Sequence, residues 1–241
     1  MQGLSNTGNN CYVNAIVQAM RYCKPIVTKL VDASPDNEFA AYLCDLLYQG
    51  NEHGLSYMLN EMHSIGMDPH TPSDAHEFYL EVVNKLDKWL DHGNTESTLQ
   101  CSCGYSTTST EKFWSISING DVAEGIDHYE KPEHVEATCE KCGGIGMTKS
   151  LKILPSPMLV VHLKRFDMDG KLNYKTTIPP ALRGHKLTAV CNHYGSMNGG
   201  HYTTCALTDQ GWMSFNDETV TKIDTFPPTS SLPYILFYTS Y

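Results

Sequence analysis

One cysteine stands in a setting that favours chemistry at its sulfur. Cys11 follows a loop rich in Gly and Asn and opens a segment whose apolar side chains recur at helical spacing: Val13, Ile16, Val17 and Met20. Asn9 or Asn10 can cap this helix, which places the thiol in its first turn. Unpaired N–H groups and the helix dipole there favour the thiolate, so the sequence predicts a nucleophile. The alternative is a buried structural cysteine, because free cysteines pack as small hydrophobic residues.

A cysteine nucleophile needs a base within hydrogen-bond reach and a third group that orients the base. His201 follows a glycine pair at the start of a strand-like run, and Asn216 and Asp217 end the next run. Antiparallel strands place the start of one strand beside the end of its neighbour, so we expect His201 to meet Asn216 or Asp217. Either side chain can accept the imidazole N–H. His193 is the rival base.

Four further cysteines form two short pairs, Cys101 with Cys103 and Cys139 with Cys142. Four thiolates in two close pairs can close a tetrahedral zinc site of the structural kind. The second pair has the usual two intervening residues, whereas the first has only one. The sequence therefore predicts structural Zn²⁺, with a weak or metal-free site as the alternative.

Two halves of different pattern carry these residues. Residues 1–92 are predicted to be mostly helical. The apolar-periodic segments that follow the first helix are 38–48, 55–65 and 70–90. Later stretches are rich in β-branched and aromatic residues, with Gly, Pro and Asn between them, which predicts antiparallel strands. These stretches are 113–118, 149–153, 158–166, 187–192, 201–207, 212–215 and 233–238. Neither half has the pattern of a self-contained core, so we expect the two to face each other across a cleft.

Composition excludes several classes of protein. The chain has 241 residues, of which 41% are hydrophobic and 18% charged, as in a globular domain. Its formal net charge of -10 disfavours nucleic acid and anionic membranes as partners and favours a basic partner. Nine cysteines, an odd and uneven set, indicate free thiols and a metal in a reducing compartment. Neither a membrane-length apolar run nor a signal-peptide pattern is present, so we expect a cytoplasmic or nuclear protein.

Four stretches together resemble the signatures of one enzyme family. GNNCYVNA, with Asn6 five residues before Cys11, is similar to the cysteine box of the ubiquitin-specific proteases, which are deubiquitinases. HYGSMNGGHY followed by WMSFNDETV resembles their histidine box, and SDAHEF and LPSPMLVVHLKRF resemble the two signatures between. The likeness runs in order along nearly the whole chain. It implies an α+β, papain-like cysteine protease fold with a helical thumb, an antiparallel β palm and shortened, zinc-tipped β fingers.

The resemblance also implies a domain organisation and catalytic roles. Residues 1–241 would form a single catalytic domain, with the thumb in 1–92, short fingers in 93–150 and the palm in 151–241. It assigns the nucleophile to Cys11, the general base to His201 and the oxyanion donor to Asn6. Asn216 matches the third triad member, and Asp217 the adjacent acid that assists or replaces it, so the dominant orienting residue is left open.

A second group of residues is implied to bind ubiquitin. Asp74 and Glu77 match acidic positions that receive its basic tail, and their i, i+3 spacing places both on one helix face. Ordinary solvated helix charges are the alternative for this pair. Gly199, Gly200 and Tyr202 flank His201, where backbone without side chains leaves a narrow channel that suits a Gly-Gly tail. The implied partners are ubiquitin and ubiquitinated proteins, bound by a monomer.

The chain departs from the family pattern in ways that leave alternatives open. Asn10 stands where the family mostly has Thr, and Ser73 where it mostly has Gln. The segments that form the fingers and the loops over the tail channel are short. The sequence alone admits a protease for another Gly-Gly-ending modifier or an inactive ubiquitin-binding module. It also leaves open a stand-alone enzyme or an excised core.

Overall fold

The computed structural model describes residues 2–50, 52–64, 67–68, 71–168, 170–196, 199–224 and 229–240. Its N-terminal part consists of helices, which we call the thumb: α1 (Cys11–Arg21), α2 (Lys24–Ala33), α3 (Glu38–Gln49), α4 (Glu52–Ser64) and α5 (Ala75–Lys85). None of the helices in these residues is long and apolar enough to cross a membrane.

Local sequence explains where two of these helices begin. Asp74 precedes α5 in extended conformation, and its carboxylate accepts hydrogen bonds from the backbone N–H groups of His76 and Glu77. Pro25, which interrupts the apolar pattern in the sequence, lies in the first turn of α2. A helix makes no use of the N–H that proline lacks at that position, so Pro25 begins a helix here and does not end one.

The palm is an eight-stranded sheet with the order β14-β13-β12-β11-β16-β6-β3, and β10 pairs with β11 beside this path. Its strands are β3 (Ile116–Ile118), β6 (Met158–Leu163), β10 (Ala181–Leu182), β11 (His185–Ser196), β12 (Gly199–Thr208), β13 (Gly211–Asn216), β14 (Thr219–Lys222) and β16 (Pro233–Ser240). Neighbouring strands are antiparallel except β3, which runs parallel to β6. The prediction of an entirely antiparallel region is wrong at that edge.

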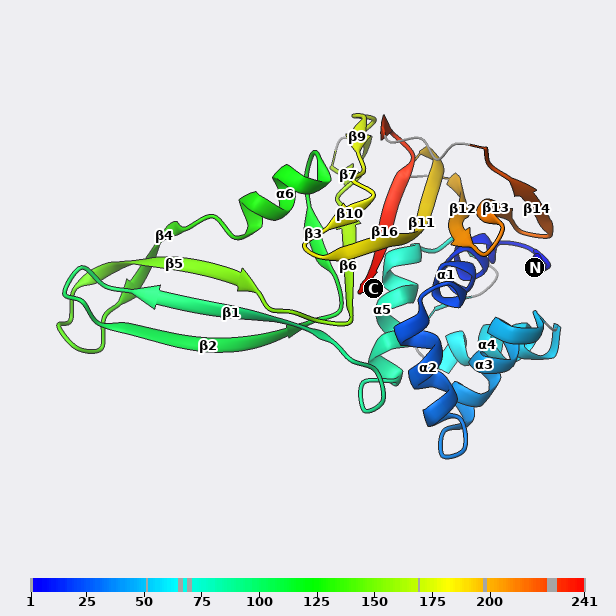
Figure 1. Ribbon diagram of the computed structural model, residues 1–241, viewed down its shortest axis with the longest axis horizontal. Coiled ribbons are helices and arrows are strands. Elements are labelled where there is room, and N and C mark those ends of the chain that lie inside the picture. Colours follow the sequence, from blue (N-terminus) through cyan, green and yellow to red (C-terminus); the bar gives the residue numbers. More distant parts are fainter. Residues whose placement is uncertain are drawn as a thin grey trace.

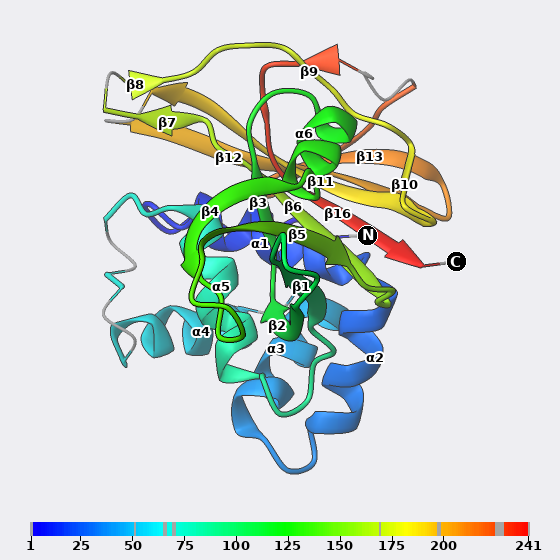
Figure 2. The ribbon, with the colours of Figure 1, turned by 90° about the vertical axis from the view of Figure 1, so that its left-hand side faces the viewer.

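The palm sheet is buried on both faces, as alternate residues of β6 illustrate. Val160 belongs to the core shared with the thumb, whereas Leu159 and Val161 point into a second core on the opposite face. The second core is covered by α6 (Val122–Tyr129), as Figure 2 shows in the layering of helix, sheet and thumb. Thumb and palm therefore pack directly on each other, with α1 lying against β12.

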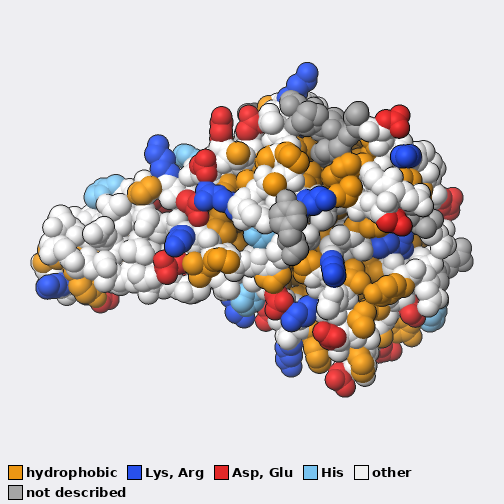
Figure 3. Space-filling view, in the orientation of Figure 1, with side chains coloured by type: hydrophobic (Ala, Val, Ile, Leu, Met, Phe, Trp, Pro, Cys, Tyr) orange, Lys and Arg blue, Asp and Glu red, His pale blue; other side chains and the backbone are white. Residues whose placement is uncertain are grey.

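A second, four-stranded sheet extends away from this body, and we call it the fingers (Figure 1). Its order is β2-β1-β5-β4. The strands are β1 (Gly93–Gln100), β2 (Ser106–Phe113), β4 (Glu133–Thr138) and β5 (Ile145–Ile153). Most of its surface in Figure 3 is neutral and polar, because β1 and β2 are rich in Ser and Thr.

Two small pairs of strands complete the fold. They are β7 (Phe166–Asp167) with β8 (Gly170–Lys171), and β9 (Thr176–Thr177) with β15 (Thr229–Ser230). A buried arginine lies beside them: Arg165 donates to the backbone oxygens of Pro233 and Tyr174 and to the hydroxyl of Thr176. Its guanidinium also stacks on the Tyr174 ring, 4.3 Å from the centroid, which ties this segment to β16.

Candidate active site

Cys11 begins α1 and is 9% exposed, next to β12. Burial raises the pKa of its thiol, while the backbone N–H of Tyr202, which hydrogen-bonds the sulfur, lowers it. The net direction is upward. The sequence-based expectation of a thiolate favoured by the helix terminus is therefore wrong for the resting structure, because desolvation outweighs the N–H groups. The capping expectation also differs, since Asn10 occupies the N-cap position without a side-chain capping bond.

His201 is held by the neighbouring strand of the palm. Its Nε2 lies 2.6 Å from Oδ1 of Asn216. An amide oxygen can only accept, so Nε2 carries the hydrogen and the ring's lone pair is on Nδ1. Because the pairing of β12 with β13 places the start of one beside the end of the other, the structure brings together the residues that the sequence paired.

Asp217 faces the loop before α1 more closely than it faces His201. The distance from its Oδ2 to Nε2 of His201 is 4.0 Å. The same oxygen accepts a hydrogen bond of 2.9 Å from the side-chain amide of Asn6, and Oδ1 accepts one of 2.8 Å from Asn14. Asp217 adopts a left-handed φ of 49°, which turns its side chain toward this loop. Its direct partners are thus two asparagines.

A pocket of about 580 Å³ opens beside the thiol. Loop and helix residues of the thumb form one wall and the palm forms the other. The lining residues are Asn9, Cys11, Tyr12, Pro72, Ser73, Asp74, Phe166, His193, Ser196, Gly199, Gly200, Tyr202 and Tyr234. Among the described residues, this pocket therefore lies where a cleft between the two halves was expected. Four of the predicted ubiquitin-binding residues lie in it, and Glu77 does not.

Asp74 lies in the pocket wall with all four of its acceptor positions in use. Oδ1 accepts from the backbone N–H groups of His76 and Glu77. Oδ2 accepts from the hydroxyls of Tyr202 and Tyr234. A carboxylate offers about four lone-pair sites, so Asp74 can act on a bound cation chiefly through its charge. Glu77 is exposed on α5.

The glycine pair before His201 contains two different positions. A Cβ on Gly199 would meet nothing within 4 Å, whereas a Cβ on Gly200 would lie 2.0 Å from Nε2 of His193. His193 is 3% exposed, and burial together with the nearby Lys171 lowers its pKa to about 4. It packs under the pocket, and a pKa this far below physiological pH makes its ring a weak proton acceptor, which disfavours it as the rival base.

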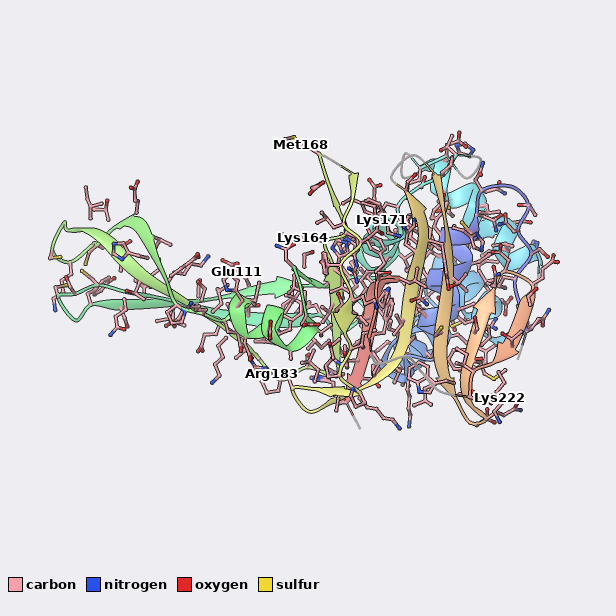
Figure 4. The ribbon with its side chains drawn as sticks, turned by 90° about the horizontal axis from the view of Figure 1, so that it is seen from above. Glu111, Lys164, Met168, Lys171, Arg183 and Lys222 are labelled. Atoms are coloured by element: carbon pink, nitrogen blue, oxygen red, sulfur yellow. The ribbon has the colours of Figure 1, made fainter. Side chains whose placement is uncertain are left out.

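The β7–β8 hairpin borders the same pocket. Phe166 lines it, and Lys171 donates from Nζ to the backbone oxygen of His193 over 2.6 Å. Figure 4 shows Met168 at the tip of this hairpin, pointing away from the body. Lys171 thus anchors the hairpin on the pocket side, while Met168 is fully exposed to solvent.

A stacked histidine pair joins thumb to palm near Asp74. The rings of His76 on α5 and His162 on β6 lie 3.8 Å apart and nearly parallel, and Tyr234 meets His162 edge-on. Ser115 and Ser117 hydrogen-bond the two imidazoles. Burial and the neighbouring His76 lower the pKa of His162 to about 3, and burial also lowers that of His76. Both rings are neutral at physiological pH.

The four cysteines of the fingers converge at the end of that sheet. Their sulfurs all lie within 4.8 Å of one another, with 3.8 Å between Cys101 and Cys142 and 3.7 Å between Cys103 and Cys139. A tetrahedral site with Zn–S bonds of 2.3 Å has sulfurs about 3.8 Å apart, so these cysteines can hold a metal ion.

The backbone accommodates the shorter first pair. A turn closes from the N–H of Gly104 to the oxygen of Cys101, three residues earlier, and a wider turn closes from the N–H of Gly143 to the oxygen of Cys139, four residues earlier. Gly104 and Gly143 have φ values of 83° and 70°, which glycine adopts without strain. The one-residue spacing between Cys101 and Cys103 is therefore compatible with the cluster.

The sequence matches the family model for ubiquitin carboxyl-terminal hydrolase over residues 2–238. The chain belongs to this family. The human ubiquitin carboxyl-terminal hydrolase 21 is 29% identical over 194 residues, a match that covers 66% of this chain and 34% of that protein. The chicken hydrolase 2 is 32% identical over 61% of this chain and 50% of its own length. The chain thus spans about one third of the first relative and half of the second. The human hydrolase 22 is 24% identical, and its match covers 99% of this chain and 65% of that protein.

Solved structures related to the family share the fold. A SAGA DUB module of Ubp8, Sgf11, Sus1 and Sgf73 bound to monoubiquitin matches with a TM-score of 0.84 at 23% identity, covering 99% of this chain and 69% of that chain. The same module bound to ubiquitin aldehyde matches with a TM-score of 0.83 at 22% identity. The α+β fold predicted from the sequence is confirmed, and the resemblance to the ubiquitin-specific protease family is confirmed with it.

Sequence reasoning missed part of the site that this hydrolase family fold assembles. Tyr234 and Phe166 line the pocket from β16 and β7. No motif contains Tyr234, and Phe166 ends the LPSPMLVVHLKRF signature without having been singled out as a pocket residue. Asn14 is 2% exposed inside an apolar helix and binds Asp217. A signal was available for Asn14, because a polar residue among buried helix positions requires a partner.

Proposed function

We propose that this chain is a deubiquitinase, a thiol-dependent hydrolase that cleaves isopeptide or peptide bonds after the C-terminal Gly-Gly of ubiquitin. The observation that carries the proposal is the bond from His201 to Asn216, on strands next to Cys11 and its pocket. It holds an imidazole with a free Nδ1 lone pair at the strand against which the thiol packs. The family membership supports the same reaction class.

The reaction begins with a thiol, since burial raises the pKa of Cys11. His201 removes the thiol proton through Nδ1 as the sulfur attacks the carbonyl carbon of the terminal glycine. The resulting imidazolium gives its proton to the departing lysine amine, and an acyl-enzyme remains on Cys11. Water, deprotonated by His201, then attacks the thioester and releases the ubiquitin carboxylate and the cysteine thiol.

Asn6 supplies the stabilisation of the tetrahedral intermediate, together with the backbone N–H of Cys11. A side-chain NH₂ has two hydrogens, so the bond from Asn6 to Asp217 uses one and leaves the other for the oxyanion. A donor of this kind contributes about 2.7–4 kcal/mol of transition-state stabilisation. Asp217 acts as the acid that orients this amide, and Asn216 as the residue that orients the base.

The pocket takes the ubiquitin tail between aromatic walls. Gly199 leaves open space for a passing main chain, and Tyr202 forms the wall behind it. Gly200 contributes indirectly, since its missing side chain lets His193 pack beneath the channel. Asp74 attracts the basic tail by charge, and the exposed Glu77 does so from outside the pocket.

Zinc is the metal proposed for the fingers, held by Cys101, Cys103, Cys139 and Cys142. Thiolate ligands at this spacing suit Zn²⁺, which has a structural role here and takes no part in the reaction. The fingers then contact the globular body of ubiquitin, while the pocket holds its tail.

The proposal includes the oligomeric state, the cellular location and the partners of the protein. All of the proposed catalytic groups lie on one chain, which supports activity as a monomer. Nine free cysteines suit the reducing cytoplasm or nucleus. The acidic chain has ubiquitin and ubiquitinated proteins as partners and neither nucleic acid nor membrane lipid.

A panel of modifier probes tests the proposal. Ubiquitin and its relatives, each with a thiol-reactive group at the C-terminus, are incubated with wild-type protein, Cys11→Ala and the control Cys44→Ala. We expect a covalent adduct with ubiquitin in the wild type and the control, and none in Cys11→Ala, because only Cys11 borders the pocket.

Two other results would replace the proposal. Adducts with a different modifier alone would retain the mechanism and change the substrate to another Gly-Gly-ending protein. A folded protein that binds ubiquitin but reacts with no probe would be a catalytically inactive ubiquitin-binding module. Turnover by Cys11→Ala would remove Cys11 as the nucleophile.

A further inference from the structure

The most buried helix of the thumb carries a row of amide side chains. Asn10, Asn14 and Gln18 are 1%, 2% and 1% exposed, at the start of α1 and along it. Residues four apart lie on the same face of a helix, so these three form one polar row on a helix whose other residues, except Arg21 at its end, are hydrophobic. Buried amides need partners, and the identity of the partners indicates what the row does.

The partners of the row are main-chain atoms of the segment before the helix. Gln18 donates to the oxygen of residue 2 over 2.9 Å, and Asn14 donates to the oxygens of residues 4 and 5 over 3.3 and 3.2 Å. Asn10 donates to the oxygen of residue 5 over 3.0 Å and accepts the N–H of residue 7 over 2.8 Å. Residues 2–6 form neither helix nor strand, so α1 itself imposes their conformation.

The same row reaches the catalytic residues through one carboxylate. Asn10 donates to Oδ1 of Asn14 over 3.1 Å, and Asn14 donates to Oδ1 of Asp217 over 2.8 Å. Oδ2 of Asp217 accepts the amide of Asn6 over 2.9 Å. Each hydrogen bond along this chain of side chains fixes the orientation of the next side chain. The chain ends at Asn6, the proposed oxyanion donor.

The main chain reinforces the contact between the loop and the β13–β14 turn. The N–H of Leu4 donates to the backbone oxygen of Asp217 over 3.0 Å. Gly3 packs closely on Glu218, the residue after Asp217. A Cβ on Gly3 would lie 2.4 Å from the backbone oxygen of Glu218. Figure 1 shows the N-terminal segment passing between α1 and this hairpin.

We propose that Asn10 and Asn14 are positioning residues that hold the loop of residues 4–8 and, through Asp217, aim the Asn6 amide at the oxyanion. This inference rests on the proposed hydrolase function. Asn10 uses both amide hydrogens and also accepts two bonds from Thr7. A threonine hydroxyl donates only once, so the residue in this chain makes a bond that threonine cannot.

Asn14→Asp is the sharpest test, because it replaces a donor to Asp217 by a second carboxylate of the same size. At pH 8 the two carboxylates repel each other, Asp217 turns away, and Asn6 loses its orientation. We expect kcat for ubiquitin–aminomethylcoumarin to fall on the order of a hundredfold, as for a displaced catalytic group, with KM within about threefold. The ratio of mutant to wild-type kcat should rise as the pH falls and one carboxylate takes up a proton.

Asn10→Thr is the second variant, and it removes one donor without adding charge. We expect a fall in kcat of about tenfold with KM unchanged, because the loop keeps the contacts of Asn14. Alkylation of Cys11 by iodoacetamide forms no oxyanion, so its rate should stay at the wild-type value in Asn10→Thr, which leaves the charges around the thiol unchanged. Asn173→Asp, at an exposed position, is the control for the added charge and should match wild type throughout.

The outcomes separate this inference from the proposed function. Wild-type protein without activity toward any Gly-Gly probe would end the proposed function and the inference with it. Active wild type with kcat of both variants within twofold, or a pH-independent mutant ratio for Asn14→Asp, would overturn the positioning role alone. If Asn14→Asp does not fold, as judged by thermal unfolding, the kcat and alkylation rate of Asn10→Thr decide the question.

Discussion

The body and the fingers are stabilised in different ways. Thumb and palm share one large apolar core, and a second core lies on the opposite palm face. In the fingers, the described residues form a single buried hydrophobic cluster of Cys101, Cys139 and Met147, two of which belong to the four cysteines that can hold a metal ion. The difference implies that burial of apolar surface holds the body together, whereas the thiol cluster holds the far end of the fingers.

The two sheets illustrate this difference strand by strand. In β16 every residue but the last is buried, so the strand contributes side chains to both palm cores. In β2 all residues are exposed or half-buried, and seven of the eight are Ser, Thr, Glu or Lys. A sheet with so little apolar surface gains little from the hydrophobic effect, so a cross-link at its tip has a large influence.

Removing the metal should produce the largest effect, and it should be confined to the fingers. Cys139→Ser, or a chelator added to zinc-loaded protein, leaves an incomplete ligand set, and structural zinc contributes about 10 kcal/mol or more in small domains. We expect hydrogen exchange to lose protection at the ends of β1, β2, β4 and β5, while α1 and β16 keep theirs. Turnover of ubiquitin–aminomethylcoumarin should fall through KM, with little change for a short Gly-Gly coumarin peptide.

Cys44→Ser controls for the loss of a thiol, since Cys44 is buried in α3 far from the cluster. It should leave protection in the fingers unchanged. Equal loss of protection in both sheets after chelation would mean that body and fingers unfold as one unit, and the contrast drawn above would not hold.

Acid should act on the body. The pKa values of His162 and His193 are lowered to about 3 and 4 from an ordinary value of 6.5. The unfolded chain therefore binds protons below pH 6.5 that the folded chain refuses, and stability is lost as the pH falls from 6.5 toward 4. Each histidine lowers the free energy of unfolding by at most about 1.4 kcal/mol for each pH unit in this range.

Urea unfolding of the body at pH 7.5, 6.5, 5.5 and 4.5 measures this slope. His162→Asn should reduce this slope by the amount that corresponds to about one proton taken up on unfolding. His134→Asn, at an exposed position in the fingers, should leave the slope unchanged. The same pH dependence in His162→Asn and wild type would show that the stacked pair accepts protons without cost.

Close packing in the body gives the smallest expected effect. Gly200→Ala places a Cβ against His193, so we expect a loss of about 1–3 kcal/mol in unfolding free energy from the forced displacement. Gly199→Ala is a matched control one residue away, with open space around its Cβ. It should keep wild-type stability and raise KM only, since it narrows the channel. Equal melting temperatures for the two variants would contradict the packing role of Gly200.

Sequence reasoning succeeded where a periodic pattern or a motif carried the information. The palm strands were predicted because β-branched and aromatic runs stand between turn residues, as in β6 and β16. Strand adjacency alone placed His201 beside Asn216 or Asp217 and left open which of the two accepts from the imidazole; in the structure the hydrogen bond is to Asn216. The strands β1, β2 and β4 and helix α6 were not predicted, because Ser- and Thr-rich strands and an eight-residue helix have little apolar periodicity.

The remaining errors have a tertiary origin. The helix terminus does lower the pKa of Cys11 locally, but burial against β12 raises it more, and no local pattern contains that burial. Asn10 turns away from its capping role because the loop of residues 4–8 offers it better partners. Both errors come from contacts between segments that the sequence does not place.

The carboxylate of Asp74 has a consequence for how the pocket receives a peptide. It caps the first turn of α5 and at the same time accepts hydroxyls from Tyr202 on β12 and Tyr234 on β16. This one side chain therefore links a thumb helix to two palm strands and fixes the distance between them. The walls of the pocket are spaced before a peptide arrives, so an entering tail loses its own conformational freedom but need not also pay for ordering the protein.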